Sequence, residues 1–181
     1  MAHITRLVLM KALILILMLT GTPIIAQAQV KVDIQAGGAN FLGLSINTEF
    51  DIPIYREKGH MLMPRFGVGR TFPGYRSPSS IIHFGLHYRI RKFGIGCETA
   101  GFATSPFDSD SNFFDPPSDI LVYPDLNYTF SFNRNPHLYL RLSAGVYFAF
   151  DKIRDDISGK NKLEWQGDPI PGAGLTCGYA F

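Results

Sequence analysis

The chain has 181 residues, of which 46% are hydrophobic and 13% aromatic, and its formal net charge is +2. This length suits a single domain. Its 17 basic and 15 acidic residues form neither a basic stripe nor a polybasic cluster, so the sequence argues against binding to nucleic acid or to an anionic inner-leaflet surface.

Residues 1–28 have the three parts of an export signal. Arg6 and Lys11 form the positive region, Ala12–Leu19 is an unbroken apolar run, and Ala26-Gln27-Ala28 is a small-x-small cleavage site. The apolar run is shorter than the ~20 residues that a membrane-spanning helix requires. No Cys follows the cleavage site, which argues against a lipoprotein. We therefore expect a cleaved signal peptide, whose loss lowers the basic count from 17 to 15 and leaves the mature chain formally neutral.

From residue 29 onward, apolar residues alternate with polar or small ones at a period of two, which is the signature of half-buried strands. Eight runs follow this pattern, at residues 30–36, 42–54, 64–69, 82–91, 95–100, 125–132, 138–150 and 170–181. The longer runs reach the ~10 residues that a tilted transmembrane strand needs. We predict that residues 29–181 form one all-β domain, an eight-stranded antiparallel up-and-down transmembrane β-barrel.

The connections between these runs alternate between short and long, as periplasmic turns and extracellular loops do in such barrels. Three tight turns are expected, at residues 55–60, 92–94 and 133–137. Three longer loops are expected, at residues 73–79, 104–119 and 152–169, whereas the first connection on their side, 37–41, is short. We expect loops 104–119 and 152–169 to be the variable contact region, because binding residues concentrate on loops.

Periodicity alone does not say which face of the barrel is outside. A soluble exported barrel of the lipocalin kind would place the apolar face inward. Three features favour an apolar exterior: a polar phase rich in Gly, Ser and Ala, as a narrow lumen requires, aromatic residues near strand ends, and a chain that stops at the end of the last strand. The aromatic residues concerned are Phe41, Tyr55, Phe72, Tyr88, Phe93, Phe132, Phe148, Phe150 and Phe181.

The last run, Ile170–Phe181 (IPGAGLTCGYAF), alternates small and apolar residues and ends on Phe181. Together with the export signal, it resembles the closing strand of a bacterial outer-membrane barrel. The mature chain as a whole resembles the small eight-stranded barrels related to the transmembrane part of outer-membrane protein A, in the style of the Bacteroidota. The resemblance implies a monomer in the outer membrane of a Gram-negative bacterium, in contact with membrane lipid and lipopolysaccharide, with Phe181 read by the barrel-insertion machinery. Fold alone does not select a function within this group.

The polar phase carries charged residues at a similar height above the expected tight turns. These are Glu49, Asp51, Arg65, His87, Arg89, Glu98 and Arg141. Because buried charges must pair or become neutral, we expect a salt-bridge network that fills the lumen and leaves no open pore. A path for protons or ions through the same residues is the alternative. No cofactor is expected. If the turn is centred near Lys92 and Phe93, Glu98 faces His87 across the hairpin, with Arg89 on the diagonal. Because Arg65, Arg89 and Arg141 are expected to compete for few lumen acids, Glu98 should be the carboxylate whose loss matters most.

A lipid-A- or phospholipid-modifying enzyme is the alternative function. Its catalytic groups would come from His83 or His87, Ser45 or Ser143, and Glu98. These residues lie in the inward phase and form no local catalytic motif, so we expect no catalytic site. The two histidines are four residues apart on one strand, about 13 Å, which is too far to share a metal ion.

Asp108, Asp110 and Asn112 have the oxygen-ligand spacing of a calcium loop. Phe113 stands where such a loop needs Gly, so a solvated acidic loop is the preferred interpretation. Cys97 and Cys177 fall in the outward phase on strands that are not neighbours, and we expect two free thiols.

Overall fold

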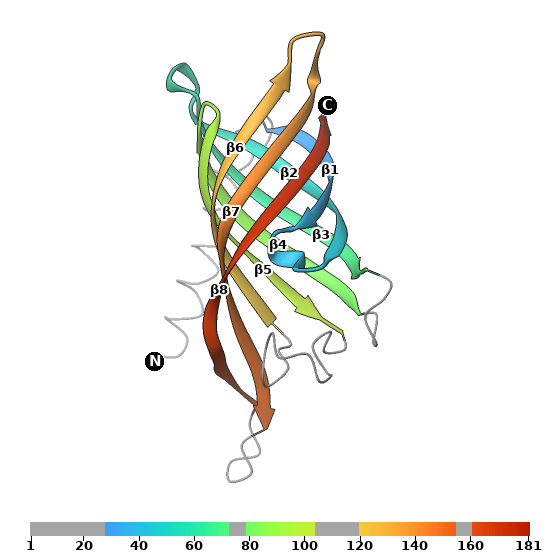
Figure 1. Ribbon diagram of the computed structural model, residues 1–181. Coiled ribbons are helices and arrows are strands. Elements are labelled where there is room, and N and C mark those ends of the chain that lie inside the picture. Colours follow the sequence, from blue (N-terminus) through green and yellow to red (C-terminus); the bar gives the residue numbers. More distant parts are fainter. Residues whose placement is uncertain (1–27, 73–78, 104–119, 155–160) are drawn as a thin grey trace, which may run out of the picture.

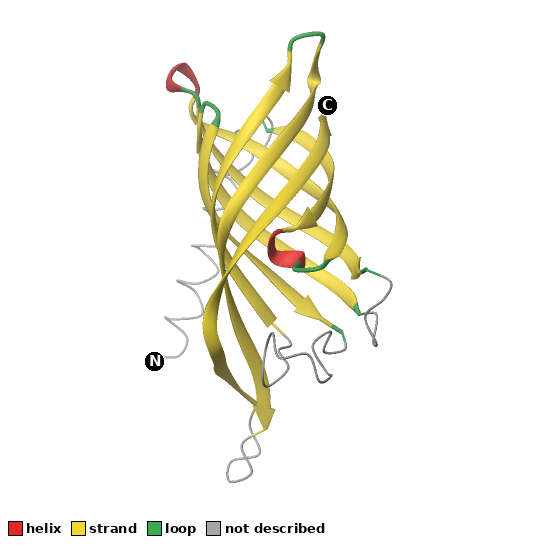
Figure 2. Cartoon of the chain, viewed as in Figure 1, coloured by secondary structure: helices red, strands yellow, loops and turns green. Residues whose placement is uncertain are grey.

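The computed structural model describes residues 28–72, 79–103, 120–154 and 161–181 (Figure 1). Its eight strands are β1 (Gln29–Gly37), β2 (Gly43–Tyr55), β3 (His60–Thr71), β4 (Ser80–Ile90), β5 (Phe93–Phe102), β6 (Ile120–Phe132), β7 (Asn135–Arg154) and β8 (Asn161–Ala180). Two short 3-10 helices, η1 (Gly38–Asn40) and η2 (Arg56–Lys58), follow β1 and β2 (Figure 2). Among the described residues, no helix is long and apolar enough to cross a bilayer.

Each strand pairs antiparallel with the next, and β1 pairs with β8 to close the barrel. The predicted eight-stranded up-and-down barrel is therefore confirmed. The short connections lie at one end of the barrel together with the start of β1 and the end of β8, since Lys31 pairs with Ala180. We call this the turn end. The opposite end, which carries η1 and the longer connections, is the loop end.

The surface of the barrel is inverted relative to that of a water-soluble protein. Val68 on β3 and Leu126 on β6 are each 65% exposed, whereas Arg65 is 1% and Arg141 is 2% exposed. Alternation along each strand therefore places apolar side chains outside and charged ones inside, as the sequence predicts. Cys97 and Cys177 are free and exposed on the outer face, also as predicted.

Aromatic rings gather on the outer face around the turn end. Phe93 contacts Tyr128 with ring centroids 4.8 Å apart, and Tyr179 contacts Phe181 at 5.1 Å. Most of the predicted aromatic positions face outward, but Phe41 does not. It packs edge-on against Tyr147 at 5.3 Å and lies against the interior cluster. The prediction for Phe41 was wrong because the chain leaves the wall of the barrel at Gly37.

The expected surface connection 37–41 folds into the barrel instead. Gly38, Ala39 and Asn40 of η1, drawn in red next to β1 in Figure 2, are all buried, and η1 lies close to all eight strands. Gly37 and Gly38 make this inward turn possible, because their φ angles of 69° and 57° lie in the left-handed region that favours glycine.

The prediction of a loop over residues 152–169 was also wrong for most of this segment. β7 continues to Arg154 and β8 begins at Asn161, so that the two strands pair as far as Arg154 with Asn161. β6 ends its pairing with β7 at Phe150, and β1 ends its pairing with β8 at Gly174. The result is a two-stranded hairpin that extends past the ends of the other strands (Figure 1).

The tight turns that the sequence predicts at 92–94 and 133–137 are shorter in the structure, since β5 begins at Phe93 and β7 at Asn135.

Candidate functional site in the barrel lumen

The residues singled out from the sequence converge inside the barrel. Glu49, Asp51, Arg65, His87, Glu98 and Arg141 are buried, and the side chain of Arg89 is 11% exposed. Three further charged residues, Lys31, Asp33 and Asp125, are buried beside them. The alternation along the sequence already places all three inward, but no spacing motif marks any of them.

The turn-end half of this network is built from β1, β2, β4 and β7. Arg141 donates two hydrogen bonds to the carboxylate of Glu49, both 2.6 Å long. Asp51 accepts from Arg89 at 2.5 Å and lies 2.7 Å from the Lys31 ammonium. Lys31 also lies 3.6 Å from Glu49. Two acids and three bases thus form one continuous cluster, with each charge next to an opposite one.

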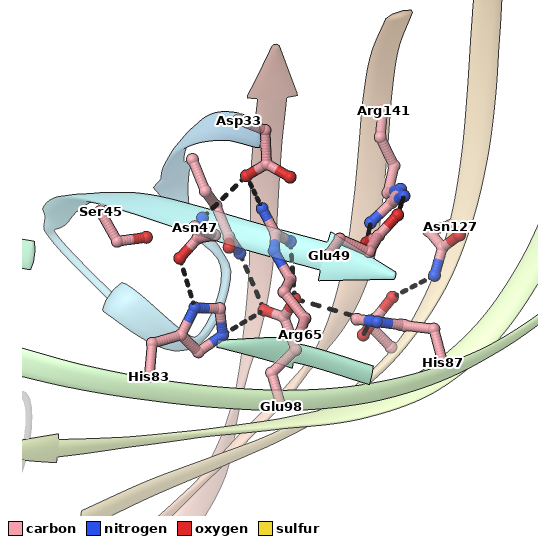
Figure 3. A network of polar contacts seen from close by, with 12 residues as sticks. Asp33, Ser45, Asn47, Glu49, Arg65, His83, His87, Glu98, Asn127 and Arg141 are labelled. Carbon is pink, nitrogen blue, oxygen red and sulfur yellow. Dashed lines mark hydrogen bonds and ion pairs between the residues drawn. The ribbon is translucent and has the colours of Figure 1, made fainter. Parts of the chain in front are cut away.

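The central part of the network is organised by Arg65 and Glu98 (Figure 3). Arg65 donates to Glu98 at 3.0 Å through one terminal nitrogen and to Asp33 through the other. The other oxygen of Glu98 accepts from Gln35 Nε2 at 2.8 Å. The Tyr139 hydroxyl donates to Asp33 at 2.7 Å. A buried charge becomes tolerable when its lone pairs and protons are satisfied in this way.

Two histidines of β4 approach the same carboxylate from opposite sides (Figure 3). His83 Nε2 lies 3.3 Å and His87 Nε2 3.6 Å from the oxygens of Glu98. His87 Nε2 is also 3.0 Å from Asp125, and His83 Nδ1 is 3.0 Å from the side-chain oxygen of Asn47. Glu98 is therefore the most connected acid of the lumen, in contact with Arg65, Gln35 and both histidines.

The structure corrects the expected surroundings of Glu98. Its partner across the β4–β5 hairpin is Gly85, and His87 pairs with Gly96. The turn is centred on Arg91 and Lys92, whereas the expected pairing of Glu98 with His87 requires a turn centred on Lys92 and Phe93, so every residue of β5 pairs with a β4 residue two positions earlier than expected. The three arginines that were expected to compete for few lumen acids each bind a different one. Arg65 binds Glu98, whereas Arg89 binds Asp51 and Arg141 binds Glu49.

Glycines leave the space that these long side chains occupy. A Cβ atom at Gly67 would lie 1.8 Å from Asn47 Oδ1, and one at Gly96 would lie 1.9 Å from the His87 ring. The inward glycines are thus the counterpart of the large inward polar residues on the neighbouring strands. Any larger residue at either position would displace part of the network.

The loop end of the lumen is apolar, which the sequence did not lead us to expect. Its buried cluster consists of Ala39, Ile81, Ala100, Phe102, Leu121, Tyr123, Tyr147 and Ala149. Ala39 comes from η1, and Asn40 of η1 donates to Ser45 Oγ at 2.7 Å. The Tyr123 hydroxyl donates to the Gly172 carbonyl at 3.2 Å. The lumen therefore has two layers, a charged one toward the turn end and an apolar one capped by η1.

The residues of the enzyme alternative are brought together only in part. His83, His87 and Glu98 are in contact, but no hydrogen bond joins Ser45 or Ser143 to either histidine in the described part of the chain. Within the same residues, no group of three or more His, Cys, Asp or Glu side chains is arranged to hold a metal ion. The candidate calcium ligands Asp108, Asp110 and Asn112, like the whole of loop 104–119, lie outside the described residues.

Comparison with known proteins gives a distant likeness to a solved structure. No protein-family model matches the chain, and no curated protein matches it. A major outer membrane protein from Thermus thermophilus is 13% identical in sequence, with a TM-score of 0.39. The alignment covers 86% of this chain and 100% of that one. The description of the barrel therefore rests on the strand pairing of the chain itself.

Proposed function

We propose that this chain is an integral outer-membrane β-barrel protein of a Gram-negative bacterium, with a lumen closed by its own side chains. The observation that carries the proposal is the inverted surface, with apolar strand faces outside and a paired charge network inside. Soluble monomers rarely expose apolar patches larger than a few hundred Å². A band of apolar side chains that runs around a closed barrel is what a bilayer requires of a spanning sheet.

The inverted surface also argues against a soluble lipocalin-like barrel. Such a barrel keeps its apolar residues in the cavity and its charges in water. Here the fully buried side chains include Arg65, Arg141 and Glu49, whereas Ile46, at 60% exposure, points outward. The aromatic rings around the turn end would lie at one membrane–water interface.

A closed lumen is supported at two levels along the barrel. The charged layer joins β1, β2, β3, β4, β5 and β7 through ion pairs, and η1 contacts all eight strands at the loop end. An eight-stranded barrel is just wide enough for side chains to fill its interior. We therefore infer a structural or surface-interaction role and no steady ion conduction.

The segments that would meet the cell surface are the loop-end connections. Among them are the connection 104–119 and the segment 152–169, most of which is the β7–β8 hairpin. We infer that they contact surface ligands, that lipid and lipopolysaccharide surround the wall, and that Phe181 is presented to the insertion machinery. Phe181 is 70% exposed, and its N–H donates to the Val30 carbonyl at 2.9 Å. We further infer a monomer without catalytic activity.

Fractionation of cells that produce the full chain tests this proposal. The protein should appear in the outer-membrane fraction, with Gln29 as its first residue. Unboiled samples should migrate faster on a gel than boiled samples, because a folded barrel stays compact in detergent. Recovery of the protein in the soluble periplasmic fraction would contradict the proposal. Unchanged lipid A and phospholipid profiles in the same cells are expected for a non-enzyme, and an altered acyl pattern would favour the enzyme alternative.

A further inference from the structure

The wall of the barrel is interrupted between β1 and β8. β1 leaves the wall at Gly37 and continues inward as η1, whereas the part of β8 before Gly174 runs on toward the loop end beside β7 alone (Figure 1). The departure is tight, because a Cβ atom at Gly37 would lie 2.5 Å from the Ala173 carbonyl oxygen. From Asn161 to Ala173, one edge of β8 therefore has no strand partner among the described residues.

A groove of about 560 Å³ lies at this interruption of the wall. Its outer walls are apolar side chains from both sides of the gap, among them Ala36, Leu42, Phe72, Leu142, Ala173 and Leu175. Tyr147 also lines it and reaches the interior cluster, so the groove extends from the outer surface to the apolar layer of the lumen. The volume lies within the range of small-molecule sites, about 300–1,000 Å³.

The open edge of β8 is unsuited to a further protein strand. Pro169 and Pro171 both lie in the segment that lacks a β1 partner. Proline has no N–H to donate, and in sheets it is confined mainly to edge strands. The two prolines lower the number of unsatisfied donors that the edge would present to lipid, where each would be costly. The same prolines weaken any ladder with an added strand, so an apolar chain fits the groove better than a peptide does.

A single charge lies on the outer wall beside the groove. Arg70 is exposed on the outward face of β3, two residues before Phe72, and β2 and β4 hold it opposite Leu44 and Ser80. Among the outward-facing strand residues of the described wall between β1 and Phe150, it alone carries a charge. No described residue forms an ion pair with it. An arginine in this position is suited to pair with a phosphate at the membrane surface.

We propose that this groove binds one acyl chain of a phosphate-bearing lipid of the outer leaflet, with Arg70 pairing with the phosphate. The proposal rests on the membrane location given above. The groove opens on the apolar outer face of the barrel, so in a bilayer its neighbours are acyl chains. The unpaired Arg70 sets the end of the groove at which the headgroup lies. Binding a chain there would cover the open edge of β8 and fill the gap that η1 leaves in the wall.

Photo-crosslinking in vesicles tests the site. The refolded chain is placed in phosphatidylcholine vesicles that contain a small amount of phosphatidic acid with a diazirine in its acyl chain. Insertion is checked first by the heat-dependent gel shift. After illumination, the labelled peptides are mapped by mass spectrometry. We expect labelling of residues 36–42 and 171–175 well above that of the outward positions around Cys97, which lie on a different part of the wall.

Three variants separate the parts of the proposal. Ala36→Phe fills the groove and should lower labelling there to the level of the Cys97 region, whereas Val32→Phe, on the same face of β1 outside the groove, should leave the pattern unchanged. Arg70→Gln should lower labelling by phosphatidic acid about fivefold, while a diacylglycerol probe with the same diazirine chain, which has no phosphate, labels both forms equally.

Uniform labelling around a correctly inserted barrel would overturn the acyl-chain site and leave the proposed function standing. Failure of the wild-type chain to insert would instead contradict the proposed function. Absence of lipid label at residues 171–175, together with a dimer of the chain in the same vesicles, would show instead that the edge of β8 takes a second strand.

Discussion

The Arg141–Glu49 pair offers the sharpest test of the lumen network, because its geometry is bidentate and both side chains are almost fully buried. Glu49→Leu removes both 2.6 Å hydrogen bonds and leaves the Arg141 guanidinium without an acid, with its Nε already lacking a partner. Breaking such a buried pair from one side costs about 3–5 kcal/mol of folding free energy. Lys31 keeps Asp51 at 2.7 Å, so the loss should remain local.

The two single substitutions should differ. Arg141→Met leaves Glu49 with Lys31 at 3.6 Å, so it should destabilise less than Glu49→Leu does. The double variant replaces the pair by apolar groups of similar size, and replacing a buried ion pair in this way is often neutral or stabilising. We therefore expect the double variant to regain most of the stability lost by Glu49→Leu.

Urea titration in lipid vesicles, followed by the fraction of fast-migrating protein on unboiled gels, measures these differences. Glu57→Leu, on the exposed η2 turn, is the control and should not move the midpoint. Two results would show that Arg141 and Glu49 do not form the pair described here. One is an unchanged urea midpoint for Glu49→Leu. The other is a double variant whose loss of unfolding free energy equals the sum of the losses in the two single variants.

Three further predictions follow from the same geometry. Glu98→Ala leaves Arg65 with Asp33 alone and should lower stability by about 3–5 kcal/mol, measured by the same urea titration; an unchanged midpoint would place Glu98 outside the network. Phe84→Arg puts a charge on the outer face and should oppose insertion by about 2–4 kcal/mol at mid-depth, whereas Lys92→Arg in a turn should have no effect; equal vesicle partitioning of the two variants would argue against lipid contact at Phe84. The purified protein should show no steady conductance in planar bilayers, and stable ohmic steps would contradict a closed lumen.

The strand content and the orientation of the faces could be predicted because they depend on a local property. Alternation with a period of two assigns each residue to one face whatever its neighbour in the sheet is. Lys31 and Asp33, for example, lie inward because Val30, Val32 and Ile34 lie outward. The length of a strand is less local. Gly167 and Pro169 break the alternation, and the hairpin continues past them through a bulge between Tyr147 and Ala149.

Cross-strand partners were harder to predict than strands and faces, because they depend on the geometry of a turn. Arg91 adopts a φ of 56°, which allows a two-residue turn with Ile90 opposite Phe93. A turn centred one residue later would have placed Glu98 opposite His87 instead of Gly85. The inward course of η1 was equally hidden. It depends on left-handed φ angles at Gly37 and Gly38 and on apolar partners such as Leu121, which is distant in sequence.

The native thiols Cys97 and Cys177 allow the most direct test of the central claim that the apolar outer face of this barrel contacts lipid. Both are exposed on strands of the wall, and neither requires a substitution before a nitroxide spin label is attached. In vesicles, we predict that both labels collide often with oxygen, which concentrates in lipid, and rarely with a water-soluble nickel chelate. A label on Lys92→Cys, in a turn, with Cys97 and Cys177 changed to Ala, provides the aqueous reference. Collision of the nickel chelate with the label at Cys97 or Cys177 as often as with that reference would contradict the membrane-facing barrel.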